Sequence, residues 1–170
     1  MGLRDLRDPL QPSRPSRNLT ETLRAYPDHM EGPDESGAAE WKRFGEGSVE
    51  RLMLAALGDR LGTSLRPRQL LLAGGVRVEV EGMDAAGAIV VQLVANQGSY
   101  RSSYRNKVMA DMFKLLWLRA AAPKVERAAV VVSAVTARAL NGWVAVAAAD
   151  LGVEVYLFDG TTVVPLHAQS

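Results

Sequence analysis

The feature that most constrains the fold is a run of apolar residues, Ile89–Ala95, which is interrupted only by Gln92. Successive side chains of a β-strand point to opposite faces of the sheet. A strand that is apolar at nearly every position must therefore be covered on both faces. Such strands occur in sheets that lie between layers of helices, so this run favours an α/β fold with a buried central strand.

The segments around this run predict the remaining elements. In order, we expect a helix that begins after Ser48 and continues to about residue 57, strands over 69–73, 77–81 and 89–95, a helix over about 104–121, a strand over 127–133, a helix from Thr136, as its cap, to about 150, and a strand over 153–158. The element order is therefore α-β-β-β-α-β-α-β. It predicts a mixed central sheet flanked by helices on both faces, with antiparallel connections among the first three strands and right-handed parallel crossovers later.

The distribution of prolines and apolar residues predicts one domain with two extensions. Residues 1–46 hold five of the eight prolines, many charges and few clustered apolar residues, which is typical of a flexible or loosely packed N-terminal arm. Residues 47–160 are expected to form the domain, and residues 161–170 a short C-terminal tail. A chain of 170 residues is long enough to bury a substantial core.

Composition excludes several classes of site. The chain has no cysteine, so it has no disulfide, thiolate nucleophile or cysteine-ligated zinc. Its two histidines, His29 and His167, are far apart in sequence, which argues against a histidine-rich metal site or a Ser–His triad. No signal peptide is apparent, and charged or polar residues interrupt the longest apolar tract, 128–149. We therefore expect a soluble, cytoplasmic protein without a membrane partner.

Polar residues are unexpected in the central strand and conspicuous in the strand before it. Strand alternation places Glu79 and Glu81 on one face, while Gln92 is a lone amide within an apolar strand. Burying that amide without a partner would cost about 1–3 kcal/mol. We therefore expect a polar partner for Gln92, and Glu81 across the hairpin is the first candidate.

The helix over 104–121 carries one charged stripe on an otherwise largely apolar surface. Lys107, Asp111 and Lys114 are spaced at i, i+4 and i+7 and so share one face. A helix that is apolar on its other sides either lies between the sheet and another layer or contacts a partner. This pattern predicts a homodimer or a protein partner through residues 104–121.

These residue types suit metal-dependent cleavage of phosphodiester bonds. Such chemistry requires carboxylates that hold Mg²⁺ or Mn²⁺ through oxygen, and a lysine that orients water or stabilises the charge that develops on phosphorus. Glu50 on the first helix, Glu81 on the hairpin, and Lys107 or Lys114 on the later helix are the candidates.

The element order and three short motifs resemble the PD-(D/E)XK, or restriction-endonuclease-like, superfamily over about residues 48–158. The motifs are V-E-V-E-G at 78–82, V-Q-L-V-A-N-Q-G at 91–98 and K-V-M-A-D-M-F-K-L at 107–115. The resemblance implies a restriction-endonuclease-like sheet, Mg²⁺ or Mn²⁺ as cofactor and nucleic acid as substrate. It also implies a role in defence or DNA processing.

The family pattern also nominates site residues. It combines an acidic residue near the start of the second strand with a Glu or Gln in the third strand and a Lys two residues later. Glu81 and Gln92 match the first two positions, whereas Val94 stands where the lysine is expected. The resemblance allows a lysine from the following helix instead, which nominates Lys107 first and Lys114 second.

The same resemblance implies a metal position. A glutamate on the first helix is common in the family, so Glu50 joins Glu81 and Gln92 as the expected metal ligands. Lys107 would then assist the attacking water.

A second group of residues suggests contacts with nucleic acid. Asn96 and Gln97 follow the central strand, and Tyr100, Arg101 and Arg105 lie where a polar loop enters the long helix. Arginines next to aromatic rings suit phosphates and stacked bases. We expect these five residues to contact nucleic acid if the protein binds it.

Each of these features also has an ordinary structural explanation. An ion-pair ladder along the long helix would contribute about 0.2–0.5 kcal/mol per pair, and an acidic residue near a helix start suits the helix dipole. The sequence leaves three functions open. They are a nuclease-fold protein, a non-catalytic interaction protein of the same fold, and a ligand-binding α/β domain, which the lack of a glycine-rich strand–helix turn disfavours.

Overall fold

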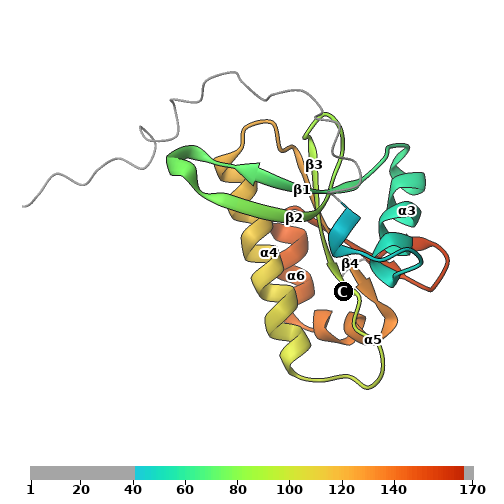
Figure 1. Ribbon diagram of the computed structural model, residues 1–170. Helices are drawn as coiled ribbons and strands as arrows, with labels where there is room; N and C mark the ends of the chain where they lie inside the picture. The colour runs from blue at the N-terminus through green and yellow to red at the C-terminus, as the bar shows by residue number, and fades with distance from the viewer. Residues whose placement is uncertain (1–40, 167–170) are drawn as a thin grey trace, which may run out of the picture.

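The apolar run forms the central strand β3 (Ile89–Val94), and every residue of this strand is buried. The computed structural model describes residues 41–166, in which β3 is the third strand of a six-stranded mixed sheet (Figure 1). The other strands, in sheet order, are β1 (Arg66–Leu71), β2 (Arg77–Met83), β4 (Arg127–Ser133), β5 (Val153–Phe158) and β6 (Val163–Pro165). Strands β1 to β3 are antiparallel, β3 to β5 are parallel, and β6 runs antiparallel to β5.

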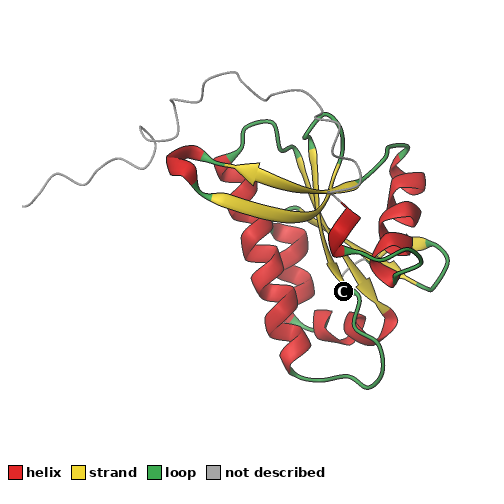
Figure 2. Cartoon of the chain, viewed as in Figure 1, coloured by secondary structure: helices red, strands yellow, loops and turns green. Residues whose placement is uncertain are grey.

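Helices cover both faces of this sheet (Figure 2). Helices α4 (Ser103–Ala121) and α6 (Trp143–Asp150) pack on one face, with Val90 and Val94 of β3 in their core. Helix α3 (Val49–Leu61) packs on the other face against Val91 and Leu93. The prediction of a mixed sheet with helices on both faces is therefore confirmed.

The long helix lies where the sequence predicted it, and its apolar residues are partly buried and partly exposed. Val108 and Leu115 are among its buried residues, whereas Phe113 is 75% exposed and Trp117 is 41% exposed.

Within residues 41–166, no helix is both long enough and apolar enough to cross a membrane.

The helix predicted from Thr136 to residue 150 is instead three elements. A short helix α5 (Ala134–Ala137) leads into a 3-10 turn η3 (Arg138–Leu140), and α6 starts only after Gly142. Gly142 has φ 64° and ψ −137°, a backbone conformation that continues no helix. Ser133, rather than Thr136, caps α5, because its Oγ accepts a hydrogen bond from the Thr136 N–H at 3.4 Å.

The first predicted strand also shifts towards the N-terminus. It was expected over 69–73, but the strand is Arg66–Leu71, and Ala73–Gly75 form the 3-10 turn η2. The positive φ of Gly74, 76°, supports a turn at the glycine pair, but β1 ends at Leu71, so the connection to β2 begins before the glycines.

The folded domain extends beyond both predicted boundaries. Trp41–Arg43 form the 3-10 turn η1, and Phe44, which the sequence assigned to the N-terminal arm, is buried in the α3 core. The segment predicted as a C-terminal tail contributes β6, whose Val163 is buried. The rest of the predicted arm, with His29, and residues 167–170, with His167, lie outside the described residues.

A β-bulge interrupts the pairing of β1 with β2. Arg68 pairs with Val80, but Arg66 pairs with Met83, so Pro67 alone stands opposite both Glu81 and Gly82. Proline has no N–H to donate to a ladder and is tolerated at such irregularities. On its other side β2 pairs with β3 only through Gly82 with Val91 and Met83 with Val90. The two strands separate at Glu81.

Gly82 allows the bulge to pack against α3. A Cβ atom at this position would lie 2.5 Å from Leu54 Cδ2 and 3.1 Å from Val91 Cβ. Because Gly82 has no side chain, β2 can lie close to Leu54 of α3 and to Val91 of β3.

We expect Gly82→Ala to lower the free energy of unfolding by about 1–3 kcal/mol, because the added methyl group overpacks the core beside α3. Urea denaturation would measure the change. Gly45→Ala is the matched control, since nothing lies within 4 Å of a Cβ there. Equal stabilities for the two variants would contradict the close packing.

Candidate functional site

Glu81 points from the bulge into the gap between β2 and β3. Its residue is only 7% exposed, and its Oε2 accepts a hydrogen bond from the backbone N–H of Leu93 at 2.5 Å. Because β2 has left the ladder at this point, the carboxylate takes the position that a strand carbonyl would otherwise occupy. The bulge thus turns a residue of the sheet into a buried acidic group.

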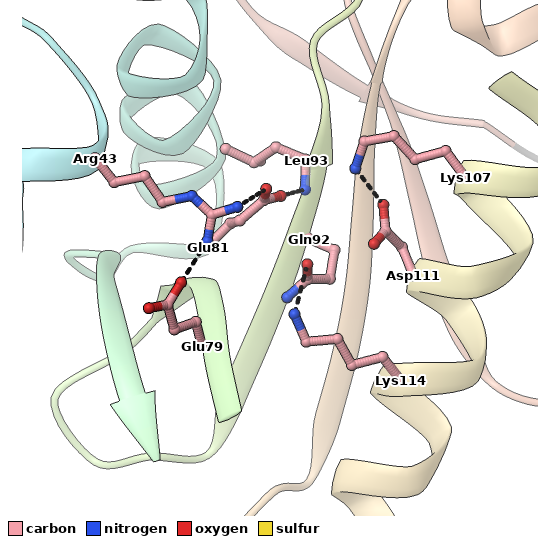
Figure 3. Close-up of polar contacts among 8 residues, drawn as sticks. All are labelled: Arg43, Glu79, Glu81, Gln92, Leu93, Lys107, Asp111 and Lys114. Atoms are coloured by element: carbon pink, nitrogen blue, oxygen red, sulfur yellow. Dashed lines mark hydrogen bonds and ion pairs between the residues drawn. The ribbon is translucent and has the colours of Figure 1, made fainter. Parts of the chain in front are cut away.

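Arg43, in the turn η1, forms an ion pair with this carboxylate. Its Nη2 lies 3.4 Å from Glu81 Oε1, and its Nη1 lies 3.1 Å from Glu79 Oε2 (Figure 3). One guanidinium therefore spans the two glutamates, which lie on the same side of β2 as the alternation predicted.

Burial raises the pKa of Glu81 above that of an ordinary glutamate. The Leu93 N–H and the positive charges of Lys107 and Arg43 lower the pKa, and the Asp111 carboxylate raises it, but loss of water is the largest effect. The carboxyl group therefore holds its proton to a higher pH than an exposed glutamate would.

Gln92 finds its partner on α4 rather than on β2. Lys114 Nζ donates to Gln92 Oε1 at 3.2 Å, and Gln92 is 1% exposed (Figure 3). The expectation that Glu81 would meet this amide was wrong, because Glu81 bonds to the backbone of Leu93 and Gln92 faces α4. The Gln92 Nε2 atom is buried without a hydrogen-bond partner.

Half-burial also changes the ionisation of Lys114. Loss of water lowers its pKa, and the nearby carboxylates of Asp111 and Glu81 raise it by less. A lysine with a lowered pKa gives up a proton more readily than a surface lysine does.

Lys107 and Asp111 form an ion pair one turn earlier on α4. The Lys107 Nζ to Asp111 Oδ2 distance is 2.7 Å, and the Asp111 side chain is only 14% exposed. Both charges act on the pKa of Glu81, so the stripe faces the site. The sequence placed Asp111 on this stripe but did not nominate it as a ligand. Its position between two lysines on one helix face could have indicated that it belongs to the site.

Glu50 is not brought into this cluster. It lies in the first turn of α3, and no hydrogen bond or ion pair connects it with Glu81, Gln92 or either lysine. An acidic residue in a first turn is favoured by the helix dipole alone.

The oxygen donors near Glu81 are few. Within residues 41–166 there is no group of three or more histidine, cysteine, aspartate or glutamate side chains that could hold a metal ion. Apart from the exposed Glu79, the oxygens of the cluster belong to two carboxylates, Glu81 and Asp111, and to the Gln92 amide. Mg²⁺ is often held by only one or two carboxylates and keeps several waters, so this set has the right chemistry for that ion.

Opposite charges are balanced within the cluster. The cluster contains three carboxylates, those of Glu79, Glu81 and Asp111. It also contains three cationic side chains, those of Arg43, Lys107 and Lys114. We refer to these six residues and Gln92 as the Glu81 cluster.

The residues expected to contact nucleic acid lie beyond the carboxyl end of β3. The Asn96 carbonyl accepts a hydrogen bond from Ser133 Oγ at 2.6 Å, while Gln97 and Arg101 are exposed. Tyr100 packs edge-on against Tyr104, and Arg105 Nη2 donates to the Asn141 carbonyl at 2.8 Å. None of these contacts involves Glu81 or the residues bonded to it.

We expect the stability of the protein to depend on pH through Glu81. Because the folded state holds this proton more tightly than the unfolded chain, this group lowers the free energy of unfolding as pH rises above about 4.5. Glu81→Gln keeps an oxygen for the Leu93 N–H but removes the titration. Its free energy of unfolding relative to wild type should therefore increase from pH 4.5 to neutral pH, as measured by urea denaturation.

Glu79→Gln is the control for this measurement, because the Glu79 side chain is 63% exposed and shares the Arg43 contact. A Glu81→Gln difference that stays constant with pH, or one that Glu79→Gln reproduces, would contradict the assignment.

Comparison with known proteins gives this cluster no family. A scan against protein-family models, a search of curated proteins and a search of solved structures found no match. The chemistry of the cluster has to be deduced from its own side chains.

Proposed function

We propose that this protein has a restriction-endonuclease-like fold and hydrolyses phosphodiester bonds in nucleic acid with Mg²⁺ or Mn²⁺. The observation that carries the proposal is the bulge opposite Pro67, which directs the buried Glu81 carboxylate into the gap between β2 and β3. Bulges are common beside active sites, where they redirect a side chain. The helix–strand order and the mixed sheet are compatible with the proposed fold.

The cluster offers a metal an acidic oxygen set. Glu81, Gln92 and Asp111 would hold the ion through oxygen, whereas Glu50 has no hydrogen bond or ion pair with any residue of the cluster and is left out of the set. When bound, the ion supplies charge neutralisation and an acidified water. Arg43 and the Leu93 N–H fix the direction of the Glu81 carboxylate.

Lys114 is the lysine that suits the proposed chemistry. It reaches Gln92 from α4, and Gln92 shares a face of β3 with Val94, so Lys114 would supply the charge that the family's strand lysine carries. Its lowered pKa favours donation of a proton, and its charge would stabilise negative charge on the phosphate. Lys107 is instead paired with Asp111 and acts on Glu81 through its charge.

A second function, non-catalytic binding, is favoured by a specific observation. The charges of the Glu81 cluster are paired with one another, which is what a structural polar network requires. In this function α4 would contact a protein partner or a second copy of the chain through Phe113 and Trp117, which are exposed and one turn apart.

Cleavage assays separate the two functions. We expect wild type to cut plasmid DNA, single-stranded DNA or RNA only with Mg²⁺ or Mn²⁺. Glu81→Ala should abolish cutting, because it removes the carboxylate in the strand gap. Lys114→Met should slow cutting by about 10²–10³-fold, as loss of one charge-stabilising donor does elsewhere, and Lys107→Met should slow it less.

Glu126→Ala controls for the loss of any glutamate, since Glu126 is exposed and outside the cluster. Cutting that persists in Glu81→Ala would contradict the proposed site. An inert wild type would favour the second function, and cutting gained by Gln92→Glu would then indicate a silenced nuclease site. In that case sedimentation of wild type and Phe113→Ala would test α4 as the interface.

A further inference from the structure

Two loops that are distant in sequence meet at one edge of the sheet. Because β3 and β4 are parallel, their carboxyl ends lie at the same edge, and residues 95–102 and 134–142 leave from there. Ser133 joins the loops, since its Oγ donates to the Asn96 carbonyl and also contacts Thr136 Oγ1 at 3.1 Å. Figure 1 shows the β3–α4 loop passing α5 at this edge. In open α/β sheets, ligands commonly bind at such an edge.

Aromatic rings and arginines from these two loops and from the starts of α4 and α6 are interleaved here. The Arg138 guanidinium lies 5.4 Å from the centre of the Tyr100 ring, and Tyr100 packs edge-on against Tyr104 at 6.0 Å between ring centres. The Arg105 guanidinium lies 5.8 Å from the centre of the Trp143 ring. The Arg105 contact with the Asn141 carbonyl fixes this guanidinium between α4 and the start of α6.

We call this region the basic-aromatic surface. It comprises Tyr100, Arg101, Tyr104, Arg105, Arg138 and Trp143. The sequence nominated three of these residues, whereas Arg138 and Trp143 lie in a tract that it predicted as one helix to about residue 150.

The charge of the surface has one sign. Residues 95–110 and 133–149 contain three arginines and one lysine, Lys107, and no aspartate or glutamate. The whole chain carries a net charge of only +1, whereas these two ranges carry +4, because they contain cations at the chain's ordinary frequency but no carboxylate. A surface of this kind attracts a polyanion, whose phosphates can displace bound counterions.

The exposed indole indicates which polyanion fits. Trp143 is 61% exposed although it begins a helix that packs on the sheet, and Arg105 lies over its ring. Flat aromatic and guanidinium groups hold bases that are free of a duplex stack, because paired bases have no face to offer. The combination of stacking groups with phosphate-binding cations therefore matches a single strand better than a duplex.

The surface leads towards the Glu81 cluster along α4. Tyr104, Lys107, Asp111 and Lys114 follow one another at spacings of three and four residues, which places them on one stripe of the helix. A strand bound at the basic-aromatic surface would therefore extend towards Glu81.

We infer that the basic-aromatic surface binds single-stranded nucleic acid, with bases on Trp143 and Tyr100 and phosphates on Arg101, Arg105 and Arg138. The inference deepens the proposed function and rests on it for the direction in which the strand runs. Binding itself requires neither a metal nor cleavage.

Fluorescence anisotropy of the full chain with a labelled oligothymidylate, in chelator and at several salt concentrations, tests the inference. Wild type should bind this strand more tightly than a duplex of mixed sequence. Trp143→Ala should weaken binding about 5- to 100-fold, the loss expected for one stacked base, and Trp143→Phe should restore most of it. Arg138→Ala should reduce the salt dependence of binding by about one phosphate contact.

Trp117→Ala is the matched control, because Trp117 is also exposed but lies further along α4. Thermal unfolding checks that each variant is folded. Equal affinities of wild type and Trp143→Ala, an equal loss in Trp117→Ala, or tighter binding of duplex would each overturn the inference.

Glu81→Ala separates this inference from the proposed function. If the variant and wild type bind the strand equally but neither cuts nucleic acid, the surface is correct and the catalytic proposal fails. If wild type cuts a duplex but does not bind the single strand, the catalytic proposal survives and the surface is wrong.

Discussion

The separation of β2 from β3 is the constraint on which the rest of the site depends. Pro67 cannot donate to a ladder, two residues of β2 face it, and β2 pairs with β3 only through Gly82 and Met83. A β3 amide then needs an acceptor, and Glu81 supplies it with a carboxylate. The unusual ionisation of Glu81 follows from this geometry, because a side chain that replaces a strand carbonyl must lie inside the sheet, away from water.

The same gap explains why the cluster is rich in cations. A buried carboxylate is costly unless opposite charges lie near it. Arg43 contacts it directly, and α4 brings Lys107 and Lys114 close enough to act on it. Such an arrangement is compatible with two roles. It satisfies a structural network, and it also places acidic and basic side chains next to one another, as the proposed phosphodiester chemistry requires.

Much of the fold was accessible from sequence because it depends on periodicity. The two-sided burial of β3 followed from Ile89–Ala95, and the extent of α4 from its spacing of apolar residues and the proline after it. The bulge was not accessible, because V-E-V-E-G reads as regular alternation and the register depends on Pro67 in another strand. The contacts of Arg138 with the Tyr100 ring and of Arg105 with the Trp143 ring were equally hidden. A tract rich in alanine and valine suggested one continuous helix, and only the backbone at Gly142 turns Trp143 outwards.

The order of the strands in the sheet is the order of the strands in the sequence. Each strand after β1 therefore pairs with the strand that precedes it. The antiparallel pairs close across short connections at little cost in chain entropy, whereas the parallel pairs β3–β4 and β4–β5 form across the helices that connect them. Glu81, Gln92, Asp111 and Lys114 come from β2, β3 and α4, which are consecutive elements. Most of the cluster can thus assemble within one continuous stretch of chain during folding, and Arg43 is the member that docks onto it from outside that stretch.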